Sequence, residues 1–175
     1  MEIIRLLLQK NNKMNSAFLL FGSNIGDAII NIENAIKHLN SREIDFVRKS
    51  SMYETEPWGF QAEQTFINQV SEVKTLKSAK DLLKTILDIE SQMGRMRNGE
   101  NYSSRIIDID ILYFNNEVIN EEELQIPHPR LHLRNFTLVP LNEIAANYTH
   151  PVFNKTNTQL MGSCTDNMQV KKRQQ

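Results

Sequence analysis

The sequence of 175 residues contains one cysteine, Cys164, so it has no pair with which to form an internal disulfide. This excludes a disulfide-stabilised secreted scaffold, and a single thiol is typical of a reducing compartment. Long apolar runs are lacking too. The early run at residues 3–8 is interrupted by Arg5, is too short to span a bilayer and lacks a small-residue cleavage site. We therefore predict a cytoplasmic protein with no membrane partner.

Charge of one sign is also lacking, since 21 acidic residues face 20 Lys and Arg and the formal net charge is -1. No overall field attracts nucleic acid or an anionic membrane, so neither is expected as a partner. Any anion binding must come from local clusters. The length fits one domain with a real core. We expect that domain at residues 16–162, a dispensable extension at residues 1–15 and a flexible tail at residues 163–175.

Residues 105–112 have the pattern of a buried strand that carries two acidic side chains. Because side chains alternate along a strand, Asp108 and Asp110 share one face and isoleucines occupy the other. Two unpaired carboxylates on neighbouring positions of one face are costly to bury, so cationic side chains or a divalent metal must lie between them. A solvated edge strand with an acidic face is the alternative. Three arginines just upstream favour a site in which metals and cations share a polyphosphate. They are Arg95, Arg97 and Arg105.

Hydrophobic periodicity predicts the order of the main elements. Strand-like runs and amphipathic helices alternate as strand, helix, strand, strand, helix, strand. This is the ferredoxin-like βαββαβ pattern of the α+β class, an antiparallel sheet with both helices on one face and the other face free for ligands. A helix at residues 137–146, with Pro140 tolerated in its first turn, adds a C-terminal helical extension. The strands are expected at 17–21, 44–54, 65–75 and 105–112, and the helices at 29–39 and 79–93.

A second set of candidate residues surrounds the long connection between the two middle strands. Phe66 and Asn68 share a strand face, and an aromatic beside an amide suits a flat heterocycle with hydrogen-bonding edges. Ordinary cross-strand packing is the alternative. The connection that follows Thr55 is long for a hairpin, and proline and glycine around Trp58 indicate a binding loop.

Charged residues elsewhere in the chain are further candidates for the predicted site. Glu90 lies at the edge of the second helix's apolar stripe and needs a partner, unless it is a plain surface charge. His128, between two prolines, precedes Arg134 and Phe136, which again combines an anion partner with an aromatic plate. The polar stretch at residues 95–104 has no apolar periodicity, so we expect a mobile lid over phosphates. The glycine turn at residues 22–27 lacks the Gly-Lys-Ser/Thr of a Walker A loop, and we interpret it as a turn.

With these residues assembled, the chain resembles the 6-hydroxymethyl-7,8-dihydropterin pyrophosphokinase family, which transfers diphosphate from ATP to a pterin in folate synthesis. The resemblance covers residues 17–151. Several ordered motifs carry it and are together far more specific than any one of them. They are FGSNIGD at 21–27, YETEPWG at 53–59, FIN at 66–68, residues 90–97, residues 105–112, and PHPRLH at 127–132 with Arg134 and Phe136.

The resemblance implies a role for each candidate residue. Asp108 and Asp110 resemble the ligands of two Mg2+ ions, and ATP is the co-substrate. Small molecules are the expected partners, the protein is expected to be a monomer, and other folate-pathway enzymes are possible associates. The implied ATP-binding residues are Glu90, Arg95, Arg97, Arg105, His128 and Arg134, of which the first three arginines are also the catalytic set. The implied pterin-binding residues are the plates Phe66 and Phe136, the hydrogen-bonding Asn68, and the pocket residues Thr55 and Trp58.

The chain departs from the common family pattern in the expected lid. Tyr102, Ser103 and Ser104 stand where Trp-Gly-Pro often precedes the arginine, and Asn101 replaces a residue that is often basic. We expect altered affinity or rate rather than lost activity.

Two other functions are considered. An RNA-binding module shares the order of elements, but the aromatic RNP1 pattern is absent and paired aspartates would repel phosphate without metal. A metal-dependent phosphohydrolase is the closer rival, because two aspartates can also activate water. The two aromatic plates favour an organic acceptor instead.

Overall fold

The computed structural model describes residues 14–56, 65–94 and 106–174, and every structural statement below concerns those residues. None of the helices in these ranges is long and apolar enough to cross a membrane. In chain order the main elements are β1 (Asn15–Ser23), α2 (Ala28–Asn40), β2 (Ile44–Lys49), β3 (Tyr53–Thr55), β4 (Phe66–Thr75), α3 (Ala79–Gln92) and β5 (Asp108–Phe114). They are followed by β6 (Ile119–Asn120), β7 (Gln125–Ile126), the 3-10 helix η1 (Leu131–Leu133), α4 (Asn135–Ala145), α5 (Asn157–Gly162) and β8 (Val170–Lys172).

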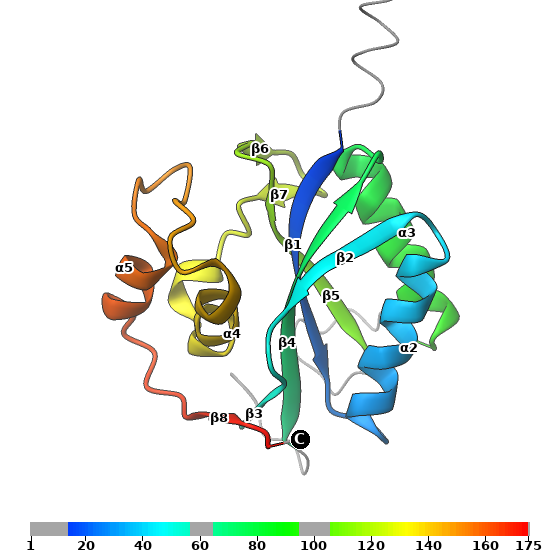
Figure 1. Ribbon diagram of the computed structural model, residues 1–175, viewed down its shortest axis with the longest axis horizontal. Coiled ribbons are helices and arrows are strands. Elements are labelled where there is room, and N and C mark those ends of the chain that lie inside the picture. Colours follow the sequence, from blue (N-terminus) through cyan, green and yellow to red (C-terminus); the bar gives the residue numbers. More distant parts are fainter. Residues whose placement is uncertain (1–13, 57–64, 95–105, 175) are drawn as a thin grey trace, which may run out of the picture.

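The larger sheet has the strand order β5-β1-β4-β3-β8, with β2 also paired to β4, and all its pairs are antiparallel (Figure 1). The predicted α+β fold with an antiparallel sheet is therefore confirmed. The predicted single strand at 44–54 is wrong in one respect, since it is broken into β2 and β3. Ser50 lies at the break, where its N–H donates to the Val70 carbonyl and its hydroxyl accepts from the Val70 N–H.

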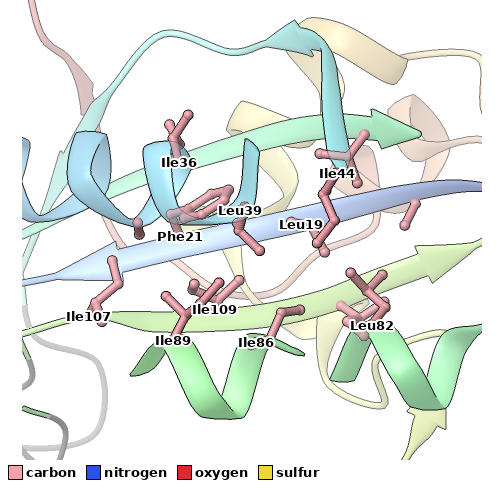
Figure 2. Packing of buried hydrophobic residues seen from close by; sticks show 14 of the residues in the cluster. Leu19, Phe21, Ile36, Leu39, Ile44, Leu82, Ile86, Ile89, Ile107 and Ile109 are labelled. Atoms are coloured by element: carbon pink, nitrogen blue, oxygen red, sulfur yellow. The ribbon is translucent and has the colours of Figure 1, made fainter. Parts of the chain in front are cut away.

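Helices α2 and α3 cover one face of the sheet, as predicted (Figure 1). Figure 2 shows isoleucine and leucine side chains from both helices meeting Leu19 and Phe21 of β1. Burying each such side chain contributes about 1.5–3 kcal/mol. The ends of α3 follow the sequence, because the Ser78 hydroxyl accepts from the Asp81 N–H and Gly94 follows the helix with a φ of 89°. The core is thus specified by local patterns.

The prediction that both helices lie on one face and leave the other free is wrong in part. Helices α4 and α5 pack on the second face, on the opposite side of the sheet from α2 and α3 (Figure 1). This face carries apolar side chains that need cover from water, and they form a second core with α4. The ladder also shifts by one residue between Phe18 and Leu19, which places both Leu112 and Tyr113 in this second core.

Helix α4 begins two residues before its predicted start. Pro140 therefore lies in its second turn and is buried, where a prolyl nitrogen cannot donate to the carbonyl four residues earlier. That carbonyl belongs to Phe136, in the first turn of α4. The prediction that proline is confined to the first turn is wrong, and burial of the ring offsets the missing hydrogen bond.

The predicted flexible tail at residues 163–175 is also contradicted, because β8 pairs with β3 within it. The outer edge of β3 presents backbone groups that need partners, and β8 supplies them. The Arg173 N–H donates to the Met52 carbonyl beyond the ladder. The short, polar sequence of β8 has no apolar alternation, so its pattern alone did not predict a strand.

Candidate functional site

A row of facing residues crosses the sheet at one end of the second face. Gly22 of β1 pairs with Asn68 on one side and with Asp108 on the other, and residues paired in this way project from the same face. Asn68 and Asp108 therefore share a face of the sheet. Gly22 leaves the position between them without a side chain. A Cβ at Gly22 would lie 3.5 Å from Asn68 Oδ1, so the glycine keeps open the space beside the amide.

The next row on this face is apolar apart from Asp110. Asp110 pairs with Leu20, and Leu20 pairs with Val70 on its other side. Both apolar side chains belong to the second core, whereas the Asp110 side chain is 34% exposed. Asp108 is half-buried. The two carboxylates therefore lie on one face, as predicted, with Asp108 in the polar row and Asp110 at the border of the core.

His128 is held next to Asp110 by the irregular part of β5. Its backbone N–H donates to the carbonyl of Leu112, the residue at the register shift, over 2.9 Å. The His128 Nδ1 accepts from the Arg130 N–H, so the neutral ring carries its proton on Nε2. Nε2 lies 3.9 Å from Asp110 Oδ2. The structure thus brings His128 and Asp110 together, a pairing that the sequence did not reveal.

The surroundings of His128 set its charge in the absence of ligand. Burial and the nearby positive charges of Arg134 and Arg130 together lower the pKa of His128 to about 4, against the opposing effect of Asp108. The ring is therefore neutral at pH 7 in the absence of ligand. His128 is a neutral hydrogen-bond donor in this state, and its contact with ATP stays a prediction.

Arg134 and Phe136 lie together at the start of α4. Arg134 is buried, and its Cζ lies 5.4 Å from the centre of the Phe136 ring. The first turn of α4 is fixed by Asp166, whose carboxylate accepts from the Asn135 N–H over 2.7 Å. Asp166 belongs to the segment predicted to be a flexible tail. Its role had no signal in the sequence, because the contact joins residues 31 positions apart.

Thr55, Phe66 and Asn68 form one group on β3 and β4. Thr55 pairs with Phe66, and the Asn68 amide donates to the Thr55 hydroxyl over 2.9 Å. Thr55 and Asn68 are buried, while Phe66 is partly exposed. The structure therefore brings these three predicted residues together. It fixes the orientation of the Asn68 amide, because one of its N–H groups is committed to Thr55.

Glu90 is 1% exposed and points from α3 to β5, where its Oε1 accepts from the Ile109 N–H over 2.8 Å. The alternative of a surface charge is wrong. That Glu90 contacts ATP stays a prediction.

The described residues include no group of three or more His, Cys, Asp or Glu side chains arranged to hold a metal ion. This does not conflict with magnesium, which proteins commonly bind through one or two carboxylates together with substrate phosphates and water. Asp108 and Asp110 fit such a site, because they share a strand face and are partly accessible. The predicted residues Trp58, Arg95, Arg97 and Arg105, together with the expected lid, lie outside the described residues.

Ser23 of the glycine turn and Asn31 of α2 contribute to the site in ways that the sequence did not indicate. The Ser23 hydroxyl donates to the Ile106 carbonyl over 2.5 Å and so joins the end of β1 to the chain just before β5. Asn31 of α2 donates in turn to the Ser23 hydroxyl and to the Ile25 carbonyl. These bonds hold the backbone around the row formed by Asn68, Gly22 and Asp108.

A family model described as 7,8-dihydro-6-hydroxymethylpterin-pyrophosphokinase (HPPK) matches residues 18–146. Among curated proteins, the chain is similar to the 2-amino-4-hydroxy-6-hydroxymethyldihydropteridine pyrophosphokinases of Aquifex aeolicus and Bacillus subtilis. The Aquifex protein is 38% identical over 142 residues, which cover 81% of this chain and 88% of that protein. The Bacillus protein is 40% identical over 131 residues, which cover 74% of this chain and 78% of that protein.

Other similar proteins are much longer than this chain. The folic acid synthesis protein FOL1 of Dictyostelium discoideum is 38% identical over 167 residues, which cover 91% of this chain and 25% of that protein. A solved structure of wild-type Plasmodium falciparum HPPK-DHPS with pteroate has a TM-score of 0.70 at 21% identity. The match covers 86% of this chain and 42% of that chain. At this identity the structural likeness supports the fold alone.

Proposed function

This chain belongs to the 7,8-dihydro-6-hydroxymethylpterin-pyrophosphokinase family and is a pyrophosphokinase of folate synthesis, and from that premise we propose its reaction and its site. The reaction is the transfer of diphosphate from ATP to the hydroxymethyl group of 6-hydroxymethyl-7,8-dihydropterin, which gives AMP and the pterin diphosphate. The row formed by Asn68, Gly22 and Asp108 is the observation that carries the proposal. It places an amide and a carboxylate on either side of a position with no side chain.

The pterin would occupy the polar end of the second face. Asn68 would hydrogen-bond to the edge of the heterocycle, with its amide oriented by Thr55. Phe66 and Phe136 are both partly exposed, as two stacking plates must be. We include Trp58 among the pocket residues by resemblance to the family. This arrangement supports recognition of a flat, polar ring.

The polyphosphate would lie beside the two aspartates. Asp108 and Asp110 would hold two Mg2+ ions, which supply neutralisation of phosphate charge when bound. His128 can donate from Nε2 to a phosphate oxygen without carrying a charge of its own. Arg134 adds a fixed positive charge, and we propose the same for Arg95, Arg97 and Arg105. Catalysis is then mostly orientation of the hydroxymethyl oxygen and charge neutralisation, with no protein nucleophile.

The test is to incubate the protein with ATP, Mg2+ and the hydroxymethyl dihydropterin and to identify the products by mass spectrometry. We expect AMP and the pterin diphosphate. ADP or free phosphate as the product would overturn the proposal, and free phosphate would favour a phosphohydrolase. The variant Asp110→Ala tests the metal-binding role of this residue. We expect it to lose turnover but to keep its thermal transition, because removing one of two like charges relieves repulsion.

We also propose that the enzyme is a monomer of the cytoplasm. We propose in addition that it associates with other folate-pathway enzymes.

A further inference from the structure

Glu90 is a buried carboxylate that the proposed reaction does not use directly. It lies on α3 among the apolar side chains of the first core, with Ile86 and Ile89 on the same buried stripe. Burying a carboxylate is costly, and an apolar residue of similar size would fit this core without that cost. The hydrogen bond from the Ile109 N–H to Glu90 Oε1 indicates what the carboxylate does there.

Ile109 is the residue between Asp108 and Asp110. Among the described residues β5 is the last strand of the sheet, so backbone groups on its outer side have no further described strand to pair with. The Ile109 N–H is one of these groups, and Glu90 takes the place of a strand partner. The hydrogen bond therefore fixes the backbone at the midpoint between the two carboxylates, from the side opposite β1.

We propose that Glu90 is a positioning residue for the metal-binding pair, acting through the Ile109 amide. The two carboxylates repel one another when no cation is bound. The hydrogen bond to the peptide between them limits how far the strand can twist to separate them. The inference depends on the proposed function, because Asp108 and Asp110 matter as a pair only if they bind metal. Loss of groups that orient metal ligands typically costs 10- to 100-fold in metal affinity or activity.

Two conservative variants distinguish the effect of the position of the Glu90 oxygens from the effect of their charge. Glu90→Gln keeps the length of the side chain and an oxygen that can accept from the Ile109 N–H, but it removes the charge. Glu90→Asp keeps the charge and withdraws the oxygens by one carbon–carbon bond, about 1.5 Å. The measurements are the Mg2+ concentration for half-maximal rate and calorimetric binding of Mg2+ with a non-hydrolysable ATP analogue. Amide hydrogen exchange at Ile109 is followed in the absence of ligands.

We expect Glu90→Asp to raise the half-saturating Mg2+ concentration by about 10-fold and to speed exchange at Ile109, with little change in the Kd for pterin. Glu90→Gln should keep both values within about 3-fold of wild type, because the acceptor remains. A loss confined to the Gln variant, or an equal loss in both variants, would overturn the inference. So would a lower thermal midpoint in Glu90→Asp with unchanged Mg2+ dependence.

Failure of the proposed function is distinguishable from failure of this inference. If wild-type protein forms no AMP, the reaction is wrong, but the binding and exchange measurements still report whether Glu90 positions the aspartates. If wild-type protein forms AMP and the two variants behave alike, the reaction stands and the positioning role fails.

Discussion

Glu143 of α4 makes several polar contacts with the sheet side of the molecule, and its removal gives a test of how the site is held together. Its carboxylate accepts from the Ser51 N–H at 2.8 Å, from the Ser51 hydroxyl at 2.9 Å and from the Tyr53 hydroxyl at 3.0 Å. Lys172 of β8 adds an ion pair at 2.9 Å. Glu143 therefore joins α4, the start of β3 and the C-terminal strand. We predict that Glu143→Ala lowers the free energy of unfolding by about 3 kcal/mol.

The magnitude follows from the exposure of each partner. Tyr53 is 6% exposed, so its hydroxyl would lose its acceptor in a buried position, at a cost of about 1–2 kcal/mol. The two bonds from Ser51 to a charged acceptor together add about 1–2 kcal/mol after allowance for the partly exposed site. The Lys172 side chain is 58% exposed, so its ion pair adds about 0.5 kcal/mol or less.

The pKa of Glu143 is independent evidence that these contacts stabilise the fold. Burial would raise the pKa of Glu143, but hydrogen bonds from Lys172, Ser51 and Tyr53 outweigh it and hold the pKa below its ordinary value. The same interaction, together with burial, raises the pKa of Tyr53 to about 12. A carboxyl whose pKa is lower in the folded state stabilises the fold above its unfolded pKa and loses that contribution as pH falls through the folded pKa. Glu143→Ala should remove this part of the acid sensitivity.

The assay is urea denaturation at pH 7 and again at acid pH, with Lys172→Met as the matched control. We expect the control to lose less than about 1 kcal/mol, because it removes only the exposed ion pair. Since α4 also carries Phe136, Glu143→Ala should raise the KM for pterin more than the KM for ATP. A loss below about 1 kcal/mol in Glu143→Ala, or an equal loss in Lys172→Met, would refute the reasoning.

Two further predictions concern Gly22, which lies between Asn68 and Asp108, and His150, which lies away from the site. Gly22→Val should weaken pterin binding about 10-fold or more by calorimetry without unfolding the protein, because its side chain fills the position between Asn68 and Asp108, while Gly22→Ala should have a smaller effect. An unchanged Kd in the valine variant would contradict this. Burial lowers the pKa of His150 from 6.5 to about 4, and its Nδ1 accepts two backbone N–H bonds, so the unfolded state binds a proton first as pH falls. The stability that neutral His150 contributes is complete above pH 6.5 and should fall by up to about 3 kcal/mol towards pH 4. In denaturation experiments, the unfolding free energy of His150→Gln should depend less steeply on pH over this range.

The elements specified by neighbouring residues could be predicted from the sequence. Helix α3 starts at its Ser78 cap and ends before Gly94, and β4 begins one residue from its predicted start. The break between β2 and β3 could not be predicted in this way, because it depends on Val70 bonding to both the backbone and the side chain of Ser50. Strand β8 likewise exists through its pairing with β3, since its own sequence has no apolar alternation.

The candidate site likewise has one part that could be predicted from the sequence and one part that could not. Alternation along one strand is local, so the shared face of Asp108 and Asp110 followed from the sequence. The register between strands is not local, and it was needed to place Gly22 between Asn68 and Asp108. Without the register, Gly22 could be interpreted only as part of a turn. The neutral state of His128 also required the fold, because burial is the main cause of its low pKa.

The second core explains why the site lies at one end of the sheet. The face opposite α2 and α3 carries apolar side chains from Phe18 and Leu20 onward, and α4 must cover them. Asp110 occupies the last row of this apolar part, paired with Leu20, whereas Asp108 lies one row further out, beside Gly22. The less polar surroundings of Asp110 make an uncompensated charge more costly there than at Asp108. Asp108 and Asp110 would together hold the proposed Mg2+ ions, and the neutral His128 beside Asp110 adds no positive charge of its own there.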